Sequence, residues 1–274
     1  TINPKNRYIA SAYFNFPQID LINNTGNIYK TILYNEYINP RHVTPLHANE
    51  EYYSTISSDS DYIYALYNRG NSLVDEIKES DGDNIIILHG SDTLAFTSSF
   101  IANLFWDKNI VLTASDKPIE DNLTNGISNF NEALRHIKKG EKGVFVSYDG
   151  IFPADTITSA DGLDKFRQTG KSQPKFKNPC LAPKNILVIK PYINIDYNNY
   201  NIESADLVLH EMYHSATVPE SAKAFAKKCR QSGVPFYFVT PKSSADYETS
   251  ADISDMIIFN TTLENAFARF NIKA

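Results

Sequence analysis

The sequence has few of the features that mark membrane, secreted or nucleic-acid-binding proteins. It contains only two cysteines, Cys180 and Cys229, which is too few for a disulfide framework or a cysteine-based metal site. No apolar run approaches the roughly 20 residues that a membrane-spanning helix needs, and no signal-peptide segment opens the chain. The formal net charge of −6 gives no general attraction to nucleic acid or anionic lipid. We therefore expect a cytoplasmic protein that binds neither nucleic acid nor membranes.

The rest of the composition is that of an ordinary globular protein. The 274 residues are 42% hydrophobic and 21% charged, and a chain of this length can bury a large core. Strand-like and helix-like segments alternate, which is typical of α/β proteins with mainly parallel sheets. We expect strands at 8–16, 85–88, 110–113, 143–147, 186–189, 207–209 and 235–239, and helices at 63–79, 94–106, 127–138, 221–231 and 263–270.

Residues 167–184 divide the chain. They are rich in lysine and proline and poor in large apolar residues, which is typical of a linker between domains. The sequence therefore predicts a larger N-terminal domain, residues 1–183 with the linker included, and a smaller C-terminal α/β domain, residues 184–274. Residues 17–58 are polar and rich in asparagine and tyrosine, and we expect loops around short elements there.

A strand that ends in a turn with hydroxyl and carboxylate groups is the most informative local pattern. Ile85–Leu88 is short and rich in β-branched residues, as buried strands are. A histidine and a glycine end it, and Ser91, Asp92 and Thr93 precede the next helix. Because ligands of open α/β sheets bind beyond the carboxyl ends of the strands, Ser91 and Asp92 are candidate catalytic residues. The alternative is that Ser91 and Thr93 only cap the helix and that Asp92 favours its N-terminus.

Several motifs together resemble the asparaginase family of the bacterial type, which uses a threonine nucleophile. His-Gly-Ser-Asp-Thr at 89–93 resembles the family's His-Gly-Thr-Asp-Thr. Asp59 and Ser60, placed as N-cap residues of the expected helix at 63–79, resemble the family's substrate-binding Asp-Ser pair. The resemblance implies a two-domain asparaginase-like fold. Further segments that resemble the family lie at 112–118, 125–129 and 159–166.

The resemblance implies a chemistry that this chain carries only in part. The family uses a threonine in a Gly-Gly-Thr-Ile turn, and a second hydroxyl beside an aspartate and a lysine that handle its proton, because an alcohol alone is a weak nucleophile. Ser91 and Asp92 retain the second hydroxyl and the carboxylate. Phe14 or Asn15 stands at the position of the first threonine, and Ile157 stands at the position of the lysine.

Two interpretations follow from these departures. In the first, an asparaginase-like protein without ordinary asparaginase activity binds or acts on a small amino acid or peptide amide, and in its extreme form it is a non-catalytic pseudoenzyme. Ser91, Asp92, Asp59 and Ser60 would then line one site. In the second, an enzyme of the same fold has rebuilt machinery in which Ser91 supplies the hydroxyl. No cofactor is expected in either case, and the resemblance implies a homo-oligomer.

A third interpretation, a zinc metallopeptidase, rests on the HExxH pattern at His210, Glu211 and His214. In such peptidases both histidines face the metal from one helix, and the glutamate is the base. Here Ala205–Leu209 is a strand-like run that continues straight into His210, and a helix opens only at Ser221. Because the four-residue spacing in a strand or loop does not place two side chains on one face, we expect no metal site.

Overall fold

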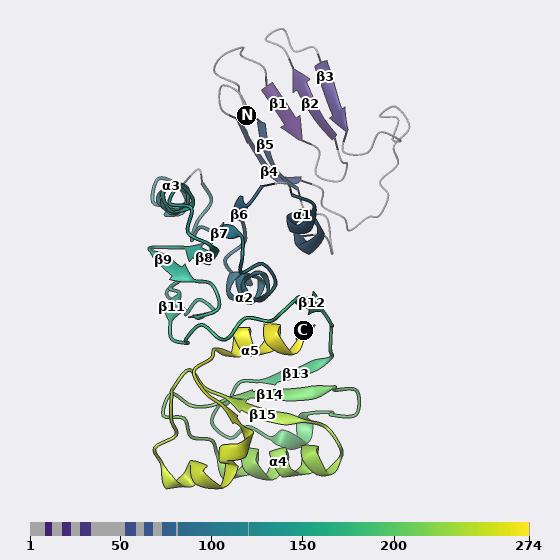
Figure 1. Ribbon diagram of the computed structural model, residues 1–274, viewed down its shortest axis with the longest axis vertical. Helices are drawn as coiled ribbons and strands as arrows, with labels where there is room; N and C mark the ends of the chain where they lie inside the picture. The colour runs from purple at the N-terminus through teal and green to yellow at the C-terminus, as the bar shows by residue number, and fades with distance from the viewer. Residues whose placement is uncertain are drawn as a thin grey trace. The chain divides into compact units, whose positions relative to one another are not determined.

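The computed structural model describes residues 73–80, 82–119 and 121–273 and, before them, five strands. Contacts divide the chain into two compact units, Thr1–Asp81 and Gly82–Ala274. The first unit holds a three-stranded antiparallel sheet, an antiparallel strand pair and one helix (Figure 1). These elements are β1 (Ile9–Ala12), β2 (Gln18–Ile22), β3 (Ile28–Leu33), β4 (Tyr53–Ser58), β5 (Ile63–Tyr67) and α1 (Leu73–Glu79).

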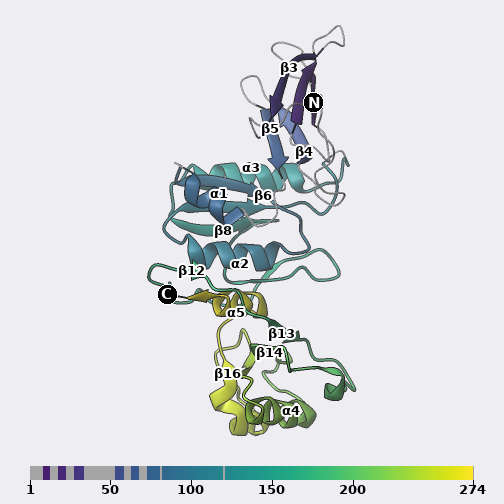
Figure 2. The ribbon, with the colours of Figure 1, turned by 90° about the vertical axis from the view of Figure 1, so that its right-hand side faces the viewer.

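The second unit begins with a four-stranded sheet in the order β6-β7-β8-β9. Its first three strands are parallel and the fourth is antiparallel to β8. Every residue of the central strand β7 is buried, as expected where helices cover both faces of a parallel sheet. Helices α2 and α3 lie on opposite faces of these strands (Figure 2). The bounds are β6 (Asn84–Leu88), α2 (Leu94–Leu104), β7 (Asn109–Thr113), α3 (Gly126–Ile137), β8 (Gly143–Ser147) and β9 (Ile151–Pro153).

A second sheet follows, and its four strands, β13 to β16, are all parallel and adjacent in chain order. Helix α4 covers one face and helix α5 the other (Figure 1). The bounds are β13 (Ile186–Ile189), the 3-10 helix η1 (Tyr197–Asn199), β14 (Leu207–Glu211), α4 (Glu220–Gln231), β15 (Phe236–Val239), the 3-10 helix η2 (Glu248–Met256), β16 (Ile257–Ile258) and α5 (Leu263–Phe270).

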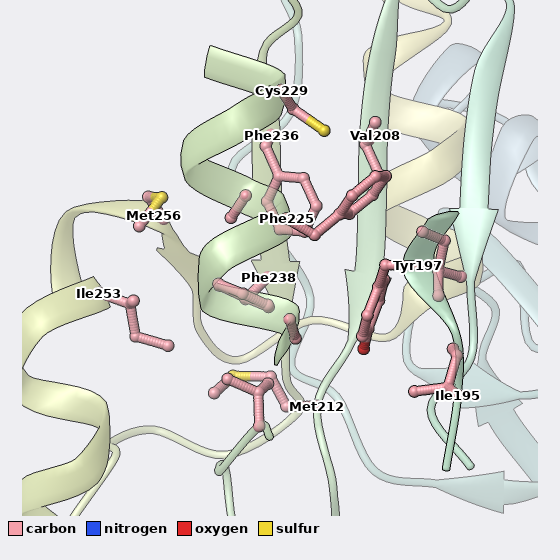
Figure 3. Close-up of a cluster of buried hydrophobic side chains, with 14 of the residues drawn as sticks. Ile195, Tyr197, Val208, Met212, Phe225, Cys229, Phe236, Phe238, Ile253 and Met256 are labelled. Carbon is pink, nitrogen blue, oxygen red and sulfur yellow. The ribbon is translucent and has the colours of Figure 1, made fainter. Parts of the chain in front are cut away.

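The alternation of side chains along β15 supplies both faces of this sheet. Phe236 and Phe238 are fully buried on the α4 side, where Phe236 meets Phe225 of α4 edge to face at 6.1 Å (Figure 3). Tyr237 points the other way and stacks on Phe270 of α5 at 5.1 Å. Since successive strand residues face opposite sides, one apolar run fills two layers of core.

Helix α5 also packs on α2, so it lies between the two sheets of the second unit. The ring of Phe267 meets the rings of Phe96 and Phe100 edge to face at 5.5 and 6.0 Å. Asn103 of α2 donates to the side-chain oxygen of Asn265 at 2.8 Å, and both residues are fully buried. The layers of this unit therefore run α3, first sheet, α2, α5, second sheet and α4.

The lysine- and proline-rich segment 167–184 is held against the second unit. Ser172 and Lys175 both donate to the carboxylate of the buried Asp155, at 2.7 and 2.9 Å. Arg269 donates to the Pro174 carbonyl at 3.0 Å and stacks over a phenylalanine ring of the segment. A domain boundary near residue 183 stays a prediction. The short strands β10 (Ile157–Thr158), β11 (Arg167–Gln168), β12 (Cys180–Leu181) and β17 (Ile272–Lys273) form two antiparallel pairs beside the sheets.

The α/β class with parallel sheets is confirmed, and two local predictions are wrong. Within the expected helix at 63–79, residues 63–67 form the strand β5 and residues 73–79 form the short helix α1. The idea that Asp59 and Ser60 cap a helix at 63 therefore fails, and the two residues themselves lie outside the described part of the chain. Residues 17–58, where we expected loops around short elements, contribute the short strands β2, β3 and β4.

None of the helices in the described residues is both long enough and apolar enough to span a bilayer.

We predict that Phe238→Ala lowers the free energy of unfolding by about 3–5 kcal/mol, because it opens a cavity in the cluster of Figure 3. The matched control is Phe130→Ala on α3, whose side chain is 37% exposed and should cost less than about 1 kcal/mol. Urea unfolding followed by circular dichroism measures both. Equal losses in the two variants would contradict this assignment of the core.

Candidate functional site

The turn that carries Ser91 and Asp92 leaves the carboxyl edge of the sheet β6-β7-β8-β9, which is the first sheet of the second unit. Leu88, the last residue of β6, lies opposite Thr113, the last residue of β7. The next backbone N–H, that of His89, donates to the Thr113 carbonyl at 2.9 Å. The turn after β6 and the loop after β7 therefore start side by side at one edge, where open α/β sheets bind ligands.

The hydroxyls of this turn do not cap helix α2. Thr93 occupies the N-cap position, yet its side chain makes no capping hydrogen bond. The N–H of Leu94 bonds to the Ser91 carbonyl at 3.3 Å, not to the hydroxyl. Within the described residues, the half-buried Ser91 hydroxyl makes no hydrogen bond, and Asp92 is exposed. The capping alternative thus loses its support, and both side chains remain available for a ligand.

The neighbouring loop, residues 114–125, is closed by a reciprocal pair of bonds. The N–H of Asp116 donates to the Asn125 side chain at 2.9 Å, and the N–H of Asn125 donates to the Asp116 carboxylate at 3.0 Å. Gly126 follows, and a Cβ there would lie 3.0 Å from the Cβ of Ser115, so the close approach favours glycine. These two bonds hold the ends of the loop together beside the carboxyl edge of the sheet.

Asn129 of α3 bonds to the starts of two loops, the one after β7 and the one after β8. Its side-chain amide donates to the Ala114 carbonyl at 2.8 Å, and its side-chain oxygen accepts from the Asp149 N–H at 2.9 Å. Its backbone carbonyl accepts from the Ser147 hydroxyl at 2.7 Å. The ends of β7 and β8 are thereby fixed to one buried side chain.

Asp149 extends this network to the surface. It accepts from the Asn125 amide at 3.1 Å and from Lys165 at 2.5 Å, and the Lys165 ammonium holds the pKa of the Asp149 carboxyl below its ordinary value. The adjacent Tyr148 is 1% exposed, and its hydroxyl has no hydrogen-bond partner in the described residues. Burial raises the pKa of this phenol. Lys165 is thus committed to an ion pair and Tyr148 holds its proton tightly, so neither is an evident base.

Ile157, at the position where the resemblance expects a lysine, belongs to the core. It is fully buried in β10, where it pairs with Gln168 of β11. An isoleucine side chain can neither accept nor donate a proton, so this position supplies no base. Phe14, Asn15, Asp59 and Ser60 lie outside the described residues.

The structure brings Ser91 and Asp92 to the same edge as Ala114, Asn125 and Asp149. Sequence reasoning noted Asn125 and Asn129 only as part of a resemblance, and it missed Tyr148. A polar aromatic residue directly after a buried strand was the available signal for Tyr148, although nothing local shows that its hydroxyl is buried.

The first two residues of the HExxH motif lie within the second sheet, and the other three follow it. His210 and Glu211 are the last two residues of β14, and His214 is exposed in the following turn. His210 is fully buried, with its Nε2 2.7 Å from the Tyr197 hydroxyl and its Nδ1 2.6 Å from the Glu211 carbonyl. Both ring nitrogens are therefore used within the fold. Burial lowers the pKa of His210 to about 4 and raises the pKa of Glu211.

Comparison with known proteins gives one consistent family. Residues 36–185 match the family model described as asparaginase, N-terminal. An L-asparaginase of Thermococcus kodakarensis is 33% identical over 97 residues, which are 34% of this chain and 29% of that protein. The matched part is thus less than a third of that relative's length.

Two solved structures are similar in fold. L-asparaginase I of Vibrio cholerae aligns with a TM-score of 0.54 and 20% identity over 73% of this chain and 72% of that one. The thermostable L-asparaginase of Thermococcus kodakarensis aligns with a TM-score of 0.51 and 21% identity over 74% of this chain and 72% of that one.

We predict that Asn129→Ala destabilises the protein by about 2–4 kcal/mol, because it leaves the Ala114 carbonyl and the Asp149 N–H without their buried partner. The control is Asn131→Ala, an exposed position two residues further along α3. Thermal and urea unfolding measure both variants. A loss below about 0.5 kcal/mol for Asn129→Ala, the size of an ordinary surface change, would show that the two loop starts hold their places without it.

We predict that the buried His210 makes stability depend on pH between its ordinary pKa of 6.5 and its folded value of about 4. In this window the unfolded chain takes up a proton that the folded protein does not, so stability is full above pH 6.5 and falls as the pH is lowered. The total loss from this group is up to about 3 kcal/mol. The double variant Tyr197→Phe, His210→Leu removes the imidazole without leaving the Tyr197 hydroxyl unpaired, and its stability should fall less steeply as the pH is lowered. Parallel pH curves for wild type and double variant would refute the assignment.

Proposed function

Because the chain belongs to the asparaginase family, we propose that its site at the carboxyl edge of the first sheet binds a small amino acid or peptide amide. Ser91 and Asp92 contact the ligand, and the family resemblance alone assigns a substrate-binding role to Asp59 and Ser60. Ordinary hydrolysis of asparagine or glutamine is absent or slower by orders of magnitude.

One observation carries the loss of ordinary activity: Ile157 occupies the lysine position and is a fully buried core residue. A serine hydroxyl needs a neighbouring group to take its proton before it can attack an amide. Lys165, the lysine next along the chain, is bound to Asp149. Replacement of the first threonine by Phe14 or Asn15 removes the other nucleophile.

A second candidate, an enzyme with rebuilt machinery, is favoured by the state of Ser91. Its hydroxyl lies half-buried and unbonded in the described part of the structure, beside a carboxylate at Asp92. In this version Ser91 is the nucleophile for an amide other than free asparagine. The zinc peptidase interpretation has no comparable support, because both ring nitrogens of His210 already bond within the protein, one to the Tyr197 hydroxyl and one to the Glu211 carbonyl.

The same proposal describes a cytoplasmic homo-oligomer that binds neither nucleic acid nor membranes. The net charge of −6 supports the absence of nucleic acid and anionic lipid as partners. Family likeness supports the oligomer. Light scattering at micromolar concentration tests it, and a monomeric mass would contradict it.

The deciding experiment measures ammonia release from asparagine, glutamine and short peptide amides, with calorimetric titration of the same compounds. Asparagine turnover should be about 10⁴-fold or more below that of a complete enzyme, because the loss of a nucleophile–base unit has this size. Binding of at least one compound should weaken in Ser91→Ala and Asp92→Ala. The control is Ser221→Ala, an exposed serine on α4.

Robust asparaginase turnover would refute the loss of activity. Turnover of another amide that Ser91→Ala abolishes would establish the second candidate. Binding or turnover that is untouched by Ser91→Ala and Asp92→Ala would place the site elsewhere.

A further inference from the structure

Helix α5, near the end of the chain, contacts two segments that lie far apart in the sequence, helix α2 and the residues at and after β10. Glu264 and Phe267 lie one turn apart, so their side chains emerge on neighbouring parts of one helix face. Phe267 packs edge to face on Phe96, which lies in the first turn of α2 directly after the turn that carries Ser91 and Asp92. The start of α2 is thus in contact with a helix more than 160 residues further along the chain.

Glu264 fixes the second segment. Its carboxylate accepts two hydrogen bonds from Ser159, one from the backbone N–H at 2.9 Å and one from the hydroxyl at 2.7 Å. Ser159 directly follows β10, whose first residue is Ile157. Glu264 itself is 2% exposed, and a carboxylate is tolerated at such a depth only where donors satisfy it.

These contacts are unlike an ordinary helix N-terminus. A first-turn glutamate often serves only the helix dipole from an exposed position, as Glu220 of α4 does: its side chain is 80% exposed and pairs with Lys223 of the same helix. Glu264 instead turns its carboxylate away from its own helix toward a loop more than 100 residues earlier. The bond therefore links the C-terminal part of the chain to the segment that follows β10.

We propose that Glu264 is a positioning residue for the candidate site: by holding Ser159, it fixes residues 157–159 relative to the start of α2. The importance of this position for a ligand rests on the proposed function. The positioning itself rests on the two bonds and the Phe267–Phe96 contact alone.

Hydrogen exchange followed by mass spectrometry on the full chain tests the proposal without any ligand. Glu264→Leu keeps the volume but removes the acceptor, and exchange in residues 157–161 should accelerate about tenfold or more. Glu264→Gln keeps an oxygen acceptor and should restore most of the protection. Ser159→Ala, which loses only the hydroxyl donor, should fall between the two.

Two references separate positioning from a general loss of stability. Peptides from β14 and β15 should exchange as in the wild type, because the second sheet does not depend on Ser159. Glu220→Leu, the matched change in the first turn of α4, should leave residues 157–161 unchanged. Protection of 157–161 that survives Glu264→Leu would overturn the proposal, and so would an equal acceleration in β14 and β15. A failure of every amino acid and amide to bind the wild type would overturn the proposed function while leaving this result intact.

Discussion

Parallel pairing of β6, β7 and β8 is the constraint on which the candidate site depends. Parallel strands end at the same edge, so strand pairing alone places the turn with Ser91, the loop that starts at Ala114 and the turn with Asp149 at one edge of the sheet. The buried Asn129 then fixes how far apart two of these loop starts lie. Chemistry at this edge is therefore limited to the groups that the strand ends deliver.

Local sequence patterns predicted the secondary structure correctly where a strand is short, apolar and followed by turn residues, as at 85–93. They failed at 63–67, because a run in which nearly every residue is apolar or aromatic fits helical spacing as well as it fits a strand. Pairing with β4 decides the matter, and this non-local partner is invisible in a window of sequence. The same limit applies to Asn129, which reads as an ordinary polar residue within a helix.

The sequence identifies the residues at the positions of Ile157 and His210, whereas the structure shows what surrounds each of them. The sequence shows that Ile157 cannot replace a lysine, and the resemblance shows why that matters. Only the structure shows that Ile157 is fully buried, so that a lysine restored there would sit in an apolar core. In the same way, the HExxH spacing is real in the sequence, whereas the strand β14 and the bond to Tyr197 give His210 a structural role.

The lysine-rich segment 167–184 has a consequence for proteolysis. Its composition is that of a preferred trypsin site, and most of its residues are exposed. A protease must draw an extended stretch of backbone into its cleft, yet the carbonyl of Pro174 is held by Arg269, and Asp155 holds Lys175 itself. Cleavage here requires the segment to open first, so the rate of nicking follows the population of that opened state. Limited digestion thus measures the free energy needed to open this segment from the rest of the second unit.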